Sequence, residues 1–329
     1  MRVVVTGGAG FIGRAVVERL HHRGDDVVAF VRDPSASQHI AHEGGGDGGT
    51  ITLVRSSLAD IGSLRDAIRG ADGLIHVAGM YRVGIKASER QAMWDANVGT
   101  TERVLDAAIA EGVPRIVYIS TVNVFGNTKG AVVDETYRRD LAEGFLSVYD
   151  ETKYRADEAA ATRIAQGAPI VIVMPSQVYG LHDHSLASEQ LHRAFHGTLG
   201  YRAFTSLGTG WVHVDDLAHG ILAALDRGAV GERYCLAGPN HTMGESVAIA
   251  ARLGGKRVPP IELPTALARL TAPLNDALGG LPGMPANLRE TISASDGVTY
   301  WASHAKATRE LGFEPRSLEQ GIVDTWGKH

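Results

Sequence analysis

The chain has 329 residues, of which 44% are hydrophobic and 21% are charged, and its formal net charge is −5. This composition is typical of a globular protein with a sizeable core, and the length predicts one large domain with a smaller lobe. The weakly acidic balance offers no basic surface for nucleic acid, and no apolar run indicates a membrane span or a secretory leader, so we expect a cytoplasmic protein that binds neither nucleic acid nor membranes.

The chain opens with a predicted strand that runs directly into glycines and then a helix. Residues 3–5 are three valines, which suit a buried strand, and residues 15–20 resume the apolar pattern at helical spacing. Between them, Gly7, Gly10 and Gly13 follow the spacing G-x-x-G-x-x-G. Glycines there let the backbone turn sharply and approach a pyrophosphate at the helix N-terminus. The sequence therefore predicts a dinucleotide-binding loop.

The residues after the second predicted strand, 27–31, indicate which dinucleotide is bound. In a dinucleotide-binding unit an acidic residue there binds the adenosine ribose, whereas an arginine accommodates a 2′-phosphate. Arg32 comes first and Asp33 one place later, with Arg14 as a possible second cation. We therefore favour NADP(H), keep NAD(H) as possible, and retain the alternative that Arg32 and Asp33 form a solvated surface pair.

Four more predicted strands, 51–54, 73–79, 115–120 and 169–174, alternate with helices. The helices are expected over residues 63–68, 89–111 and 147–165, and the glycine-rich stretch 43–49 is expected to be a loop. This alternation predicts an α/β fold of the Rossmann type, a doubly wound parallel sheet with helices on both faces.

The alternation stops after Pro175, which we take as the end of a dinucleotide-binding domain over residues 1–175. Residues 208–237, with a helix after 212–217 and a strand at 234–236, are predicted to return to that domain. Residues 176–207 and 238–329 are expected to form a small substrate-binding lobe, its helices near 244–253, 264–278, 303–311 and 318–326. The cleft between the lobe and the sheet is the expected substrate site.

The side chains with the clearest chemistry are Thr121, after the fifth strand, and Tyr149 and Lys153 on the next helix. A spacing of four places the phenol and the ammonium on one helical face. We expect the ammonium to lower the pKa of Tyr149, so that the phenol exchanges a proton with an alcohol or ketone oxygen while hydride moves to or from nicotinamide. Thr121 is expected to hold the same oxygen.

Two other features are interpreted as structural. Cys235 is the only cysteine and lies in an apolar run, so we expect a buried, inert thiol. His182 and His184 flank Asp183 without a recognised metal-ligand spacing. We interpret them as loop residues and predict no metal site.

At this point the sequence resembles the extended short-chain dehydrogenase/reductase family of NAD(P)-dependent epimerases, dehydratases and reductases. The resemblance covers nearly the whole chain. The matching motifs lie at residues 6–13, 76–79, 97–100, 118–126, 149–153, 175–180 and 212–216.

The resemblance implies a catalytic triad of Thr121, Tyr149 and Lys153, in which the lysine also binds the nicotinamide ribose. It further implies that the cofactor is bound by Gly7, Gly10, Phe11, Ile12, Gly13, Arg32, Ser57, Leu58, Val77, Ala78, Gly79, Asn97, Lys153, Pro175, Ser176 and Val178. Family members commonly form dimers, so a homodimer through the helices at 89–111 and 147–165 is expected.

Three departures from the family pattern narrow what the resemblance implies. Ser57 stands where many members have Asp, and Met174 replaces a frequent Arg. Sugar-nucleotide dehydratases carry an Asp-Glu pair directly after the threonine, where this chain has Val122 and Asn123. Because that pair supplies the acid and base for loss of water, elimination is disfavoured.

Three functions stay open at this stage. We favour an NADP(H)-dependent carbonyl reductase that interconverts a ketone and a secondary alcohol. The first alternative is a nucleotide-sugar epimerase with bound NAD, whose substrate phosphates would need cations such as Arg193, Arg202, Arg252 and Arg289. The second is a non-catalytic NADP(H)-sensing protein, which the presence of both Tyr149 and Lys153 disfavours.

Overall fold

A seven-stranded parallel sheet forms the centre of the molecule. The computed structural model describes residues 1–38, 40, 48–55, 58–280 and 284–327. The strand order is β3-β2-β1-β4-β5-β6-β9, and every neighbouring pair is parallel. The strands are β1 (Arg2–Thr6), β2 (Asp26–Val31), β3 (Ile51–Arg55), β4 (Gly73–His76), β5 (Ile116–Ile119), β6 (Ile170–Pro175) and β9 (Arg233–Leu236).

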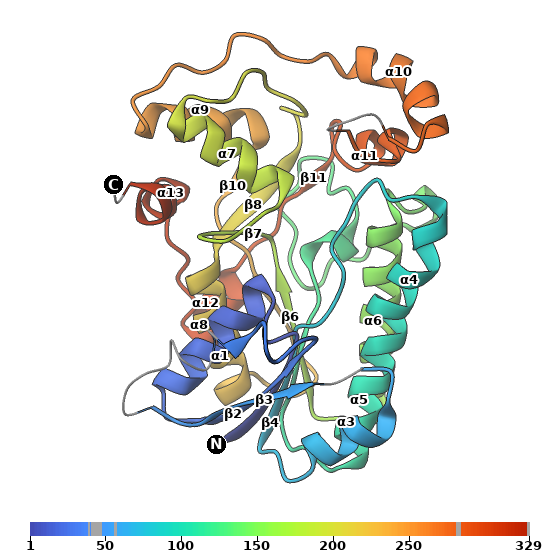
Figure 1. Ribbon diagram of the computed structural model, residues 1–329, viewed down its shortest axis with the longest axis vertical. Coiled ribbons are helices and arrows are strands. Elements are labelled where there is room, and N and C mark those ends of the chain that lie inside the picture. Colours follow the sequence, from blue (N-terminus) through green and yellow to red (C-terminus); the bar gives the residue numbers. More distant parts are fainter. Residues whose placement is uncertain (39, 41–47, 56–57, 281–283, 328–329) are drawn as a thin grey trace.

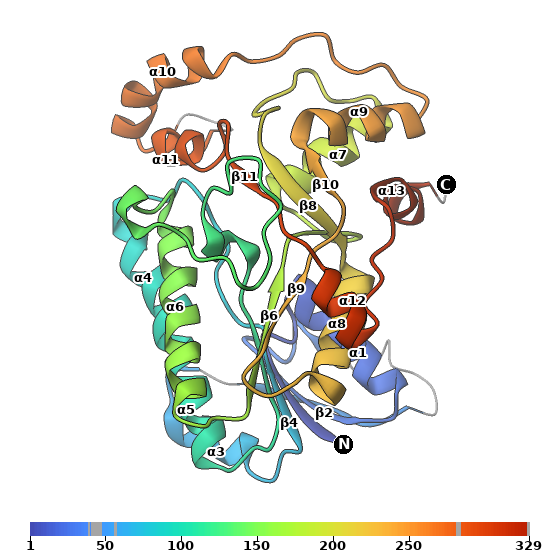
Figure 2. The ribbon, with the colours of Figure 1, turned by 180° about the vertical axis from the view of Figure 1, so that it is seen from behind.

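Helices cover both faces of this sheet (Figures 1 and 2). One face carries α1 (Phe11–His22), α8 (Val214–Arg227) and α12 (Ala305–Leu311), and the other carries α3 (Ile61–Ile68), α5 (Thr100–Ala110) and α6 (Val148–Ala165). The expected Rossmann-type doubly wound fold is confirmed.

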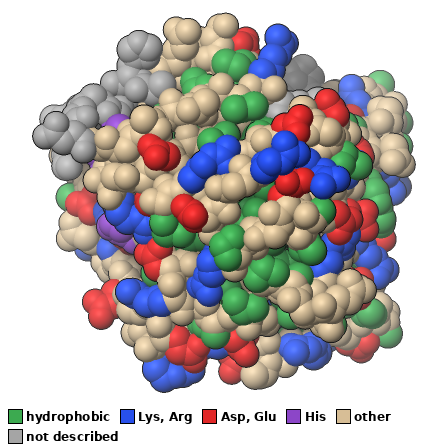
Figure 3. All heavy atoms as spheres, turned by 90° about the horizontal axis from the view of Figure 1, so that it is seen from below, with side chains coloured by type: hydrophobic (Ala, Val, Ile, Leu, Met, Phe, Trp, Pro, Cys, Tyr) green, Lys and Arg blue, Asp and Glu red, His purple; other side chains and the backbone are tan. Residues whose placement is uncertain are grey.

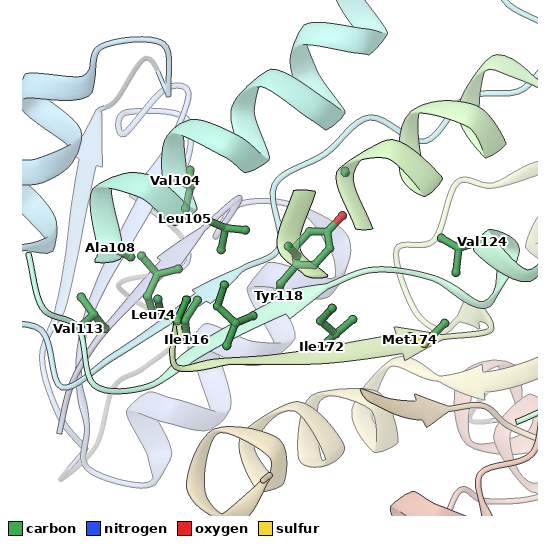
Figure 4. Packing of buried hydrophobic residues seen from close by; sticks show 14 of the residues in the cluster. Leu74, Val104, Leu105, Ala108, Val113, Ile116, Tyr118, Val124, Ile172 and Met174 are labelled. Carbon is green, nitrogen blue, oxygen red and sulfur yellow. The ribbon is translucent and has the colours of Figure 1, made fainter. Parts of the chain in front are cut away.

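Alternating residues of each strand enter two separate cores, because successive side chains of a strand point to opposite faces. Ile116 and Tyr118 of β5 pack toward α5 and α6, whereas Val117 and Ile119 pack toward α1 and α8. Figure 4 shows the first of these cores, where Tyr118 extends from the strand among Leu105 and Ile172. The continuous apolar runs of the sequence are thus explained by burial on both faces.

The helix expected over residues 89–111 is present, with one irregular turn. It consists of α4 (Arg90–Trp94), a π-helical turn η2 (Asp95–Gly99), and α5. The π turn carries Asn97, which is 2% exposed. Such turns are frequent at functional sites because they redirect one side chain of a helix.

A second, smaller sheet forms beyond β6. β8 (Gly208–His213) lies at its centre and pairs with β7 (Gln177–Tyr179), β10 (Asn240–Thr242) and β11 (Thr299–Tyr300). The helices of this part are α7 (Leu186–His196), α9 (Met243–Leu253), α10 (Thr265–Ala277), α11 (Leu288–Ser293) and α13 (Leu318–Trp326). In Figure 1 these elements lie above the carboxyl ends of the large sheet.

Sheet membership differs from the sequence expectation in two segments. Residues 208–237 divide between the sheets, because β8 joins the small sheet whereas α8 and β9 join the large one. The helix expected near 303–311 is α12, and it packs on α8 and β9 of the large domain, where Phe313 is buried and Lys306 pairs with Glu232. The stretch 176–207, expected to belong to the substrate-binding lobe, contains α7.

The remaining expectations concern the surface and the single cysteine. Within the described residues, no helix is long and apolar enough to cross a membrane, and no cluster of side chains is suited to holding a metal. On the face in Figure 3, basic and acidic side chains are interspersed. Cys235 is fully buried in β9 as expected, and burial raises the pKa of its thiol. Residues 43–47 of the predicted glycine-rich loop 43–49 lie outside the described residues.

A buried histidine joins the strands beneath the expected cofactor site. His76, at the end of β4, contacts the hydroxyl of Thr6 at 2.7 Å through Nδ1 and that of Thr101 at 3.1 Å through Nε2. Its ring stacks on Tyr118 at 5.7 Å. Burial, with a smaller contribution from the Lys153 charge, lowers the pKa of His76 to about 3. The imidazole is therefore neutral in the folded protein.

We predict that His76 makes the fold sensitive to acid. Between about pH 6.5 and about pH 3 the unfolded chain binds a proton at His76 that the folded protein does not. The stability that wild type gains from this histidine should therefore fall on acidification, by at most about 1.4 kcal/mol per pH unit. Urea unfolding of wild type and His76→Gln at pH 7 and pH 5 measures this, with the exposed His22→Gln as control. A wild-type advantage over His76→Gln that stays constant between these pH values would contradict the assignment.

Candidate active site

The glycine loop between β1 and α1 has the geometry that a dinucleotide requires. Gly7 has a φ of +72°, and a Cβ atom there would lie 3.0 Å from the backbone of Ala78. A Cβ at Gly13 would lie 2.1 Å from the carbonyl oxygen of Gly7. The N–H of Gly10 donates to the same oxygen at 2.9 Å. Gly7 and Gly13 thus permit the tight turn that brings α1 close to the strand ends.

The start of α1 fits an anionic group. Gly10 occupies the position before the helix and has no side chain to cap the first turn, which also holds no acidic residue. Gly10 is exposed and Phe11 and Ile12 are only partly buried. The helix N-terminus is positively polarised, so its first N–H groups suit a phosphate oxygen. Residues 7–13 therefore fit the pyrophosphate of a dinucleotide.

The small residues after β4 lie beside this loop. Val77 and Ala78 are partly buried and Gly79 is exposed. The N–H of Ala78 donates to the Thr6 hydroxyl at 3.2 Å, which fixes the segment against the first strand. Because the strands are parallel, Ala78 and Gly7 meet at the carboxyl edge of the sheet, where open α/β sheets bind ligands.

The side-chain amide of Asn97 binds the loop after β4. Its Nδ2 donates to the carbonyl of Met80 and to the Thr152 hydroxyl, both at 3.0 Å, and its Oδ1 accepts from the N–H of Met80 at 2.7 Å. The amide thus ties the loop after β4 to α6. Both polar atoms of Asn97 thus bind protein groups, and its implied contact with the cofactor stays a prediction.

The adenosine end of the expected site begins after β2. Arg32 is exposed, whereas the carboxylate of Asp33 accepts from the N–H of Ser35 at 2.9 Å and closes a local turn. Leu58 is partly buried, and its carbonyl accepts from Arg103 at 3.0 Å. Ser57 lies outside the described residues.

The segment after β6 borders the site from the other side. Ser176 is buried, and its hydroxyl accepts from the N–H of Gly238 at 3.2 Å. Val178, in β7, is partly buried. The carbonyl of Pro175 is 3.4 Å from the Thr121 hydroxyl, so this segment directly adjoins the expected catalytic residues.

Lys153 is held inside the protein. Its side chain is 9% exposed, and Nζ donates to the carbonyl of Ile119 at 2.9 Å and to the Tyr118 hydroxyl at 3.4 Å. Nζ also lies 5.1 Å from the centre of the Tyr118 ring. Burial lowers the pKa of Lys153 to about 8, against the opposing charge of Asp157. Tyr118 was not expected from the sequence, where it read as one more apolar strand residue.

Tyr149 differs from the expectation in its protonation. Burial raises the pKa of its phenol, the nearby Tyr81 adds to the increase, and a side-chain hydrogen bond with Thr121 opposes it. Lys153 is not among the groups that shift this pKa. The predicted lowering by the ammonium is therefore wrong for this chain, because desolvation of the phenol dominates. Tyr149 is a neutral phenol in contact with Thr121.

Two ion pairs, one buried and one partly buried, fix the helix that carries these residues. Asp150 binds Arg139 through both carboxylate oxygens, at 2.7 and 3.1 Å. One turn beyond Lys153, Asp157 binds Arg233 at 2.6 Å and accepts from the Ser120 hydroxyl at 2.7 Å. Breaking such a pair leaves a buried charge unpaired, so both pairs restrict how α6 can move.

The mouth of the site contains Tyr81, a second residue that was not predicted. Its ring is 54% exposed and meets the Tyr149 ring edge-on at 4.8 Å. Tyr81 lies in the loop after β4, and its tertiary contact with Tyr149 places it at the site. Thr121, Tyr149 and Tyr81 thus form one continuous set of hydroxyl-bearing side chains.

Comparison with known proteins identifies the family of this chain. The model of the NAD dependent epimerase/dehydratase family matches residues 3–237. The chain is 31% identical to a putative dihydroflavonol 4-reductase of Synechocystis, over 97% of this chain and 92% of the relative. It is 30% identical to a 3 beta-hydroxysteroid dehydrogenase/Delta 5-->4-isomerase of Mycobacterium tuberculosis, over 95% of this chain and 86% of the relative.

A solved structure is similar over almost the same extent. It is a double mutant of the dTDP-glucose 4,6-dehydratase DesIV from Streptomyces venezuelae with NAD bound. The TM-score is 0.78 at 25% identity, and the alignment covers 99% of this chain and 95% of that one. With the glycine loop, the parallel sheet and the Thr121, Tyr149 and Lys153 set, these matches establish that the chain is an enzyme of the NAD-dependent epimerase/dehydratase family, within the extended short-chain dehydrogenases/reductases.

Proposed function

We propose that the protein is an NADP(H)-dependent carbonyl reductase that converts a ketone into a secondary alcohol. The observation that carries the proposal is the placement of Tyr149, a buried phenol that contacts Thr121 and lies one turn before Lys153 on α6. A phenol keeps its proton at neutral pH and can donate it to a carbonyl oxygen as negative charge develops there. Reduction of a ketone to an alcohol uses Tyr149 in its protonated form.

In this proposal two side chains act on one oxygen atom, and a third, Lys153, supports them. Reduced nicotinamide, when bound, supplies hydride to the carbonyl carbon. The Thr121 hydroxyl orients the carbonyl oxygen, and Tyr149 donates its proton to that oxygen, so that a carbonyl becomes an alcohol. Lys153, one helical turn along α6, would hold the nicotinamide ribose, the role that the family resemblance implies for it.

The surroundings of Thr121 support reduction over elimination. Val122 is fully buried, and the side chain of Asn123 accepts from the Thr121 hydroxyl at 3.1 Å. Neither residue can serve as the acid or base that loss of water requires. The relatives in Synechocystis and Mycobacterium tuberculosis carry reductase and dehydrogenase names, which describe the same exchange between carbonyl and alcohol.

The four arginines considered for nucleotide-sugar phosphates are engaged within the chain. Each has a partner: Arg193 with the carbonyl of Thr198, Arg202 with Glu262, Arg252 with Glu319, and Arg289 with Asp276. Each of these cations thus has a partner within the chain, which supports a carbonyl substrate that carries no diphosphate.

The preference for NADP(H) rests on the end of β2. The carboxylate of Asp33 is used by the turn that follows, through the N–H of Ser35. Arg32 is exposed. A guanidinium without an opposing ribose-binding carboxylate suits a 2′-phosphate.

We predict that purified protein consumes NADPH stoichiometrically with a ketone from a carbonyl panel. Tyr149→Phe should retain less than about a hundredth of the wild-type rate, because general-acid groups contribute about 10²- to 10⁴-fold, while cofactor affinity stays nearly intact. Tyr154→Phe, on the same helix, is the matched control and should keep the wild-type rate. Absorbance at the NADPH band measures the rates.

Bound NAD that is never released, with no net consumption, would instead support the epimerase. A Tyr149→Phe rate above a tenth of wild type would remove this residue as the acid.

We also predict that Arg32→Ala weakens NADPH binding about 10- to 100-fold and NADH binding less than twofold, because only NADPH places a phosphate at this position. Fluorescence titration of both cofactors measures the two affinities. Arg252→Ala, an exposed arginine of the lobe, is the control and should change neither. Equal losses of both cofactors in Arg32→Ala would refute the 2′-phosphate contact.

A further inference from the structure

We propose that Glu290 is a positioning residue for Tyr149: from the C-terminal lobe, its carboxylate fixes the first turn of the helix that carries the phenol. This inference rests on the proposed role of Tyr149 as the proton donor. Glu290 lies outside residues 3–237, to which the family model extends. Its role follows from contacts of α11 with α6 and with the loop after β4.

The carboxylate of Glu290 caps the first turn of α6. Its Oε1 accepts from the N–H of Val148, the first residue of α6, at 3.0 Å. The Ser147 hydroxyl accepts from the N–H of Asp150 at 3.0 Å. Tyr149 lies between these two capped amides. A negative charge at a helix N-terminus is favourable, and an N–H without a partner there is costly.

Glu290 is itself held in one orientation. The Nδ2 of Asn287 donates to its Oε2 at 3.1 Å, and Glu290 is 9% exposed. The Oδ1 of Asn287 accepts from the N–H of Glu290 at 3.1 Å and caps α11. Both ends of the carboxylate are thus engaged, one with the lobe and one with α6.

The same short helix also holds the loop that covers Tyr149. The N–H of Asn287 donates to the carbonyl of Gly84 at 2.9 Å. Gly84 has a φ of +74°, and a Cβ there would lie 2.4 Å from the Thr291 hydroxyl, so the loop fits tightly against α11. Tyr81 of this loop meets the Tyr149 ring at 4.8 Å. One face of α11 therefore contacts both the helix of Tyr149 and the loop of its aromatic neighbour.

The lobe anchors α11 from the opposite side. The carboxylate of Asp276, at the end of α10, accepts from the N–H of Leu288 at 2.6 Å. Asn275 is fully buried and donates to the carbonyl of Pro285 at 2.8 Å. Leu288 and Ile292 of α11 pack with Ala272 of α10. The position of the lobe is thereby transmitted to Tyr149 through a chain of direct contacts, and a displacement of about 1 Å at a reacting group can cost about 100-fold in rate.

The experiment compares Glu290→Ala, Glu290→Gln and Glu245→Ala in the full chain. Glu245 is the matched control, because it caps α9 by accepting from the N–H of Thr242 at 2.8 Å, at a helix that the proposed chemistry does not use. Hydrogen exchange of the amides at 148–151 and 242–245 is measured for each variant. The kcat for NADPH-dependent ketone reduction and the KM for NADPH are measured below the melting temperature of every variant.

We expect Glu290→Ala to lower kcat at least tenfold, to leave the KM for NADPH within twofold, and to speed exchange at 148–151 at least tenfold. Glu290→Gln, which keeps an acceptor oxygen, should restore more than half of the lost protection and at least a third of the wild-type kcat. Glu245→Ala should speed exchange at 242–245 only and keep the wild-type kcat.

Two results overturn the proposal: wild-type exchange at 148–151 in Glu290→Ala, or a kcat of Glu290→Ala within twofold of that of Glu245→Ala. If Glu290→Ala does not fold, Asn287→Ser replaces it, because serine keeps the cap of α11 and removes the amide that orients Glu290. Its kcat should fall at least threefold, and a value equal to that of wild type overturns the proposal.

If the wild type reduces no carbonyl, the proposed function fails, whereas exchange at 148–151 still decides whether Glu290 holds the helix.

Discussion

The arrangement of the site depends on keeping one ammonium group charged inside the protein. An amine removed from water loses hydration and tends to lose its proton, unless nearby groups compensate. Around Lys153 the carbonyl of Ile119 and the hydroxyl and ring of Tyr118 provide this compensation, and Asp157 favours the charged form from one helical turn away. The end of β5 and the helix α6 are therefore required to stay together, which also sets where the phenol on that helix can lie.

Helix α6 is accordingly fixed at several points along its length. The buried pair of Asp150 with Arg139 holds its first turn, and the pair of Asp157 with Arg233 holds its middle. The amide of Asn97 adds a link to the loop after β4. These contacts come from parts of the chain far apart in sequence, so the helix orientation is a property of the whole large domain.

The sequence was most informative where function depends on local spacing. The glycine loop and the interval of four between Tyr149 and Lys153 are readable because a turn or a helical face is defined by neighbours in the chain. The pKa of Tyr149 was predicted in the wrong direction, since a motif shows the distance to a cation along a helix but not the burial that outweighs it. Tyr118 was overlooked because its hydroxyl matters only once α6 lies over β5. The packing of α12 on the large sheet and the contact of Glu290 with α6 depend on where the C-terminal chain runs, which local patterns do not encode.

The most direct test of a charged, buried Lys153 is the pH dependence of kcat/KM for ketone reduction at fixed ionic strength. Since the pKa of Lys153 is lowered to about 8, the rate should decline as pH rises through that value, while Lys153→Arg, which keeps its charge, should show no such decline over the same range. A wild-type profile that stays level from pH 7 to pH 10 would contradict the account.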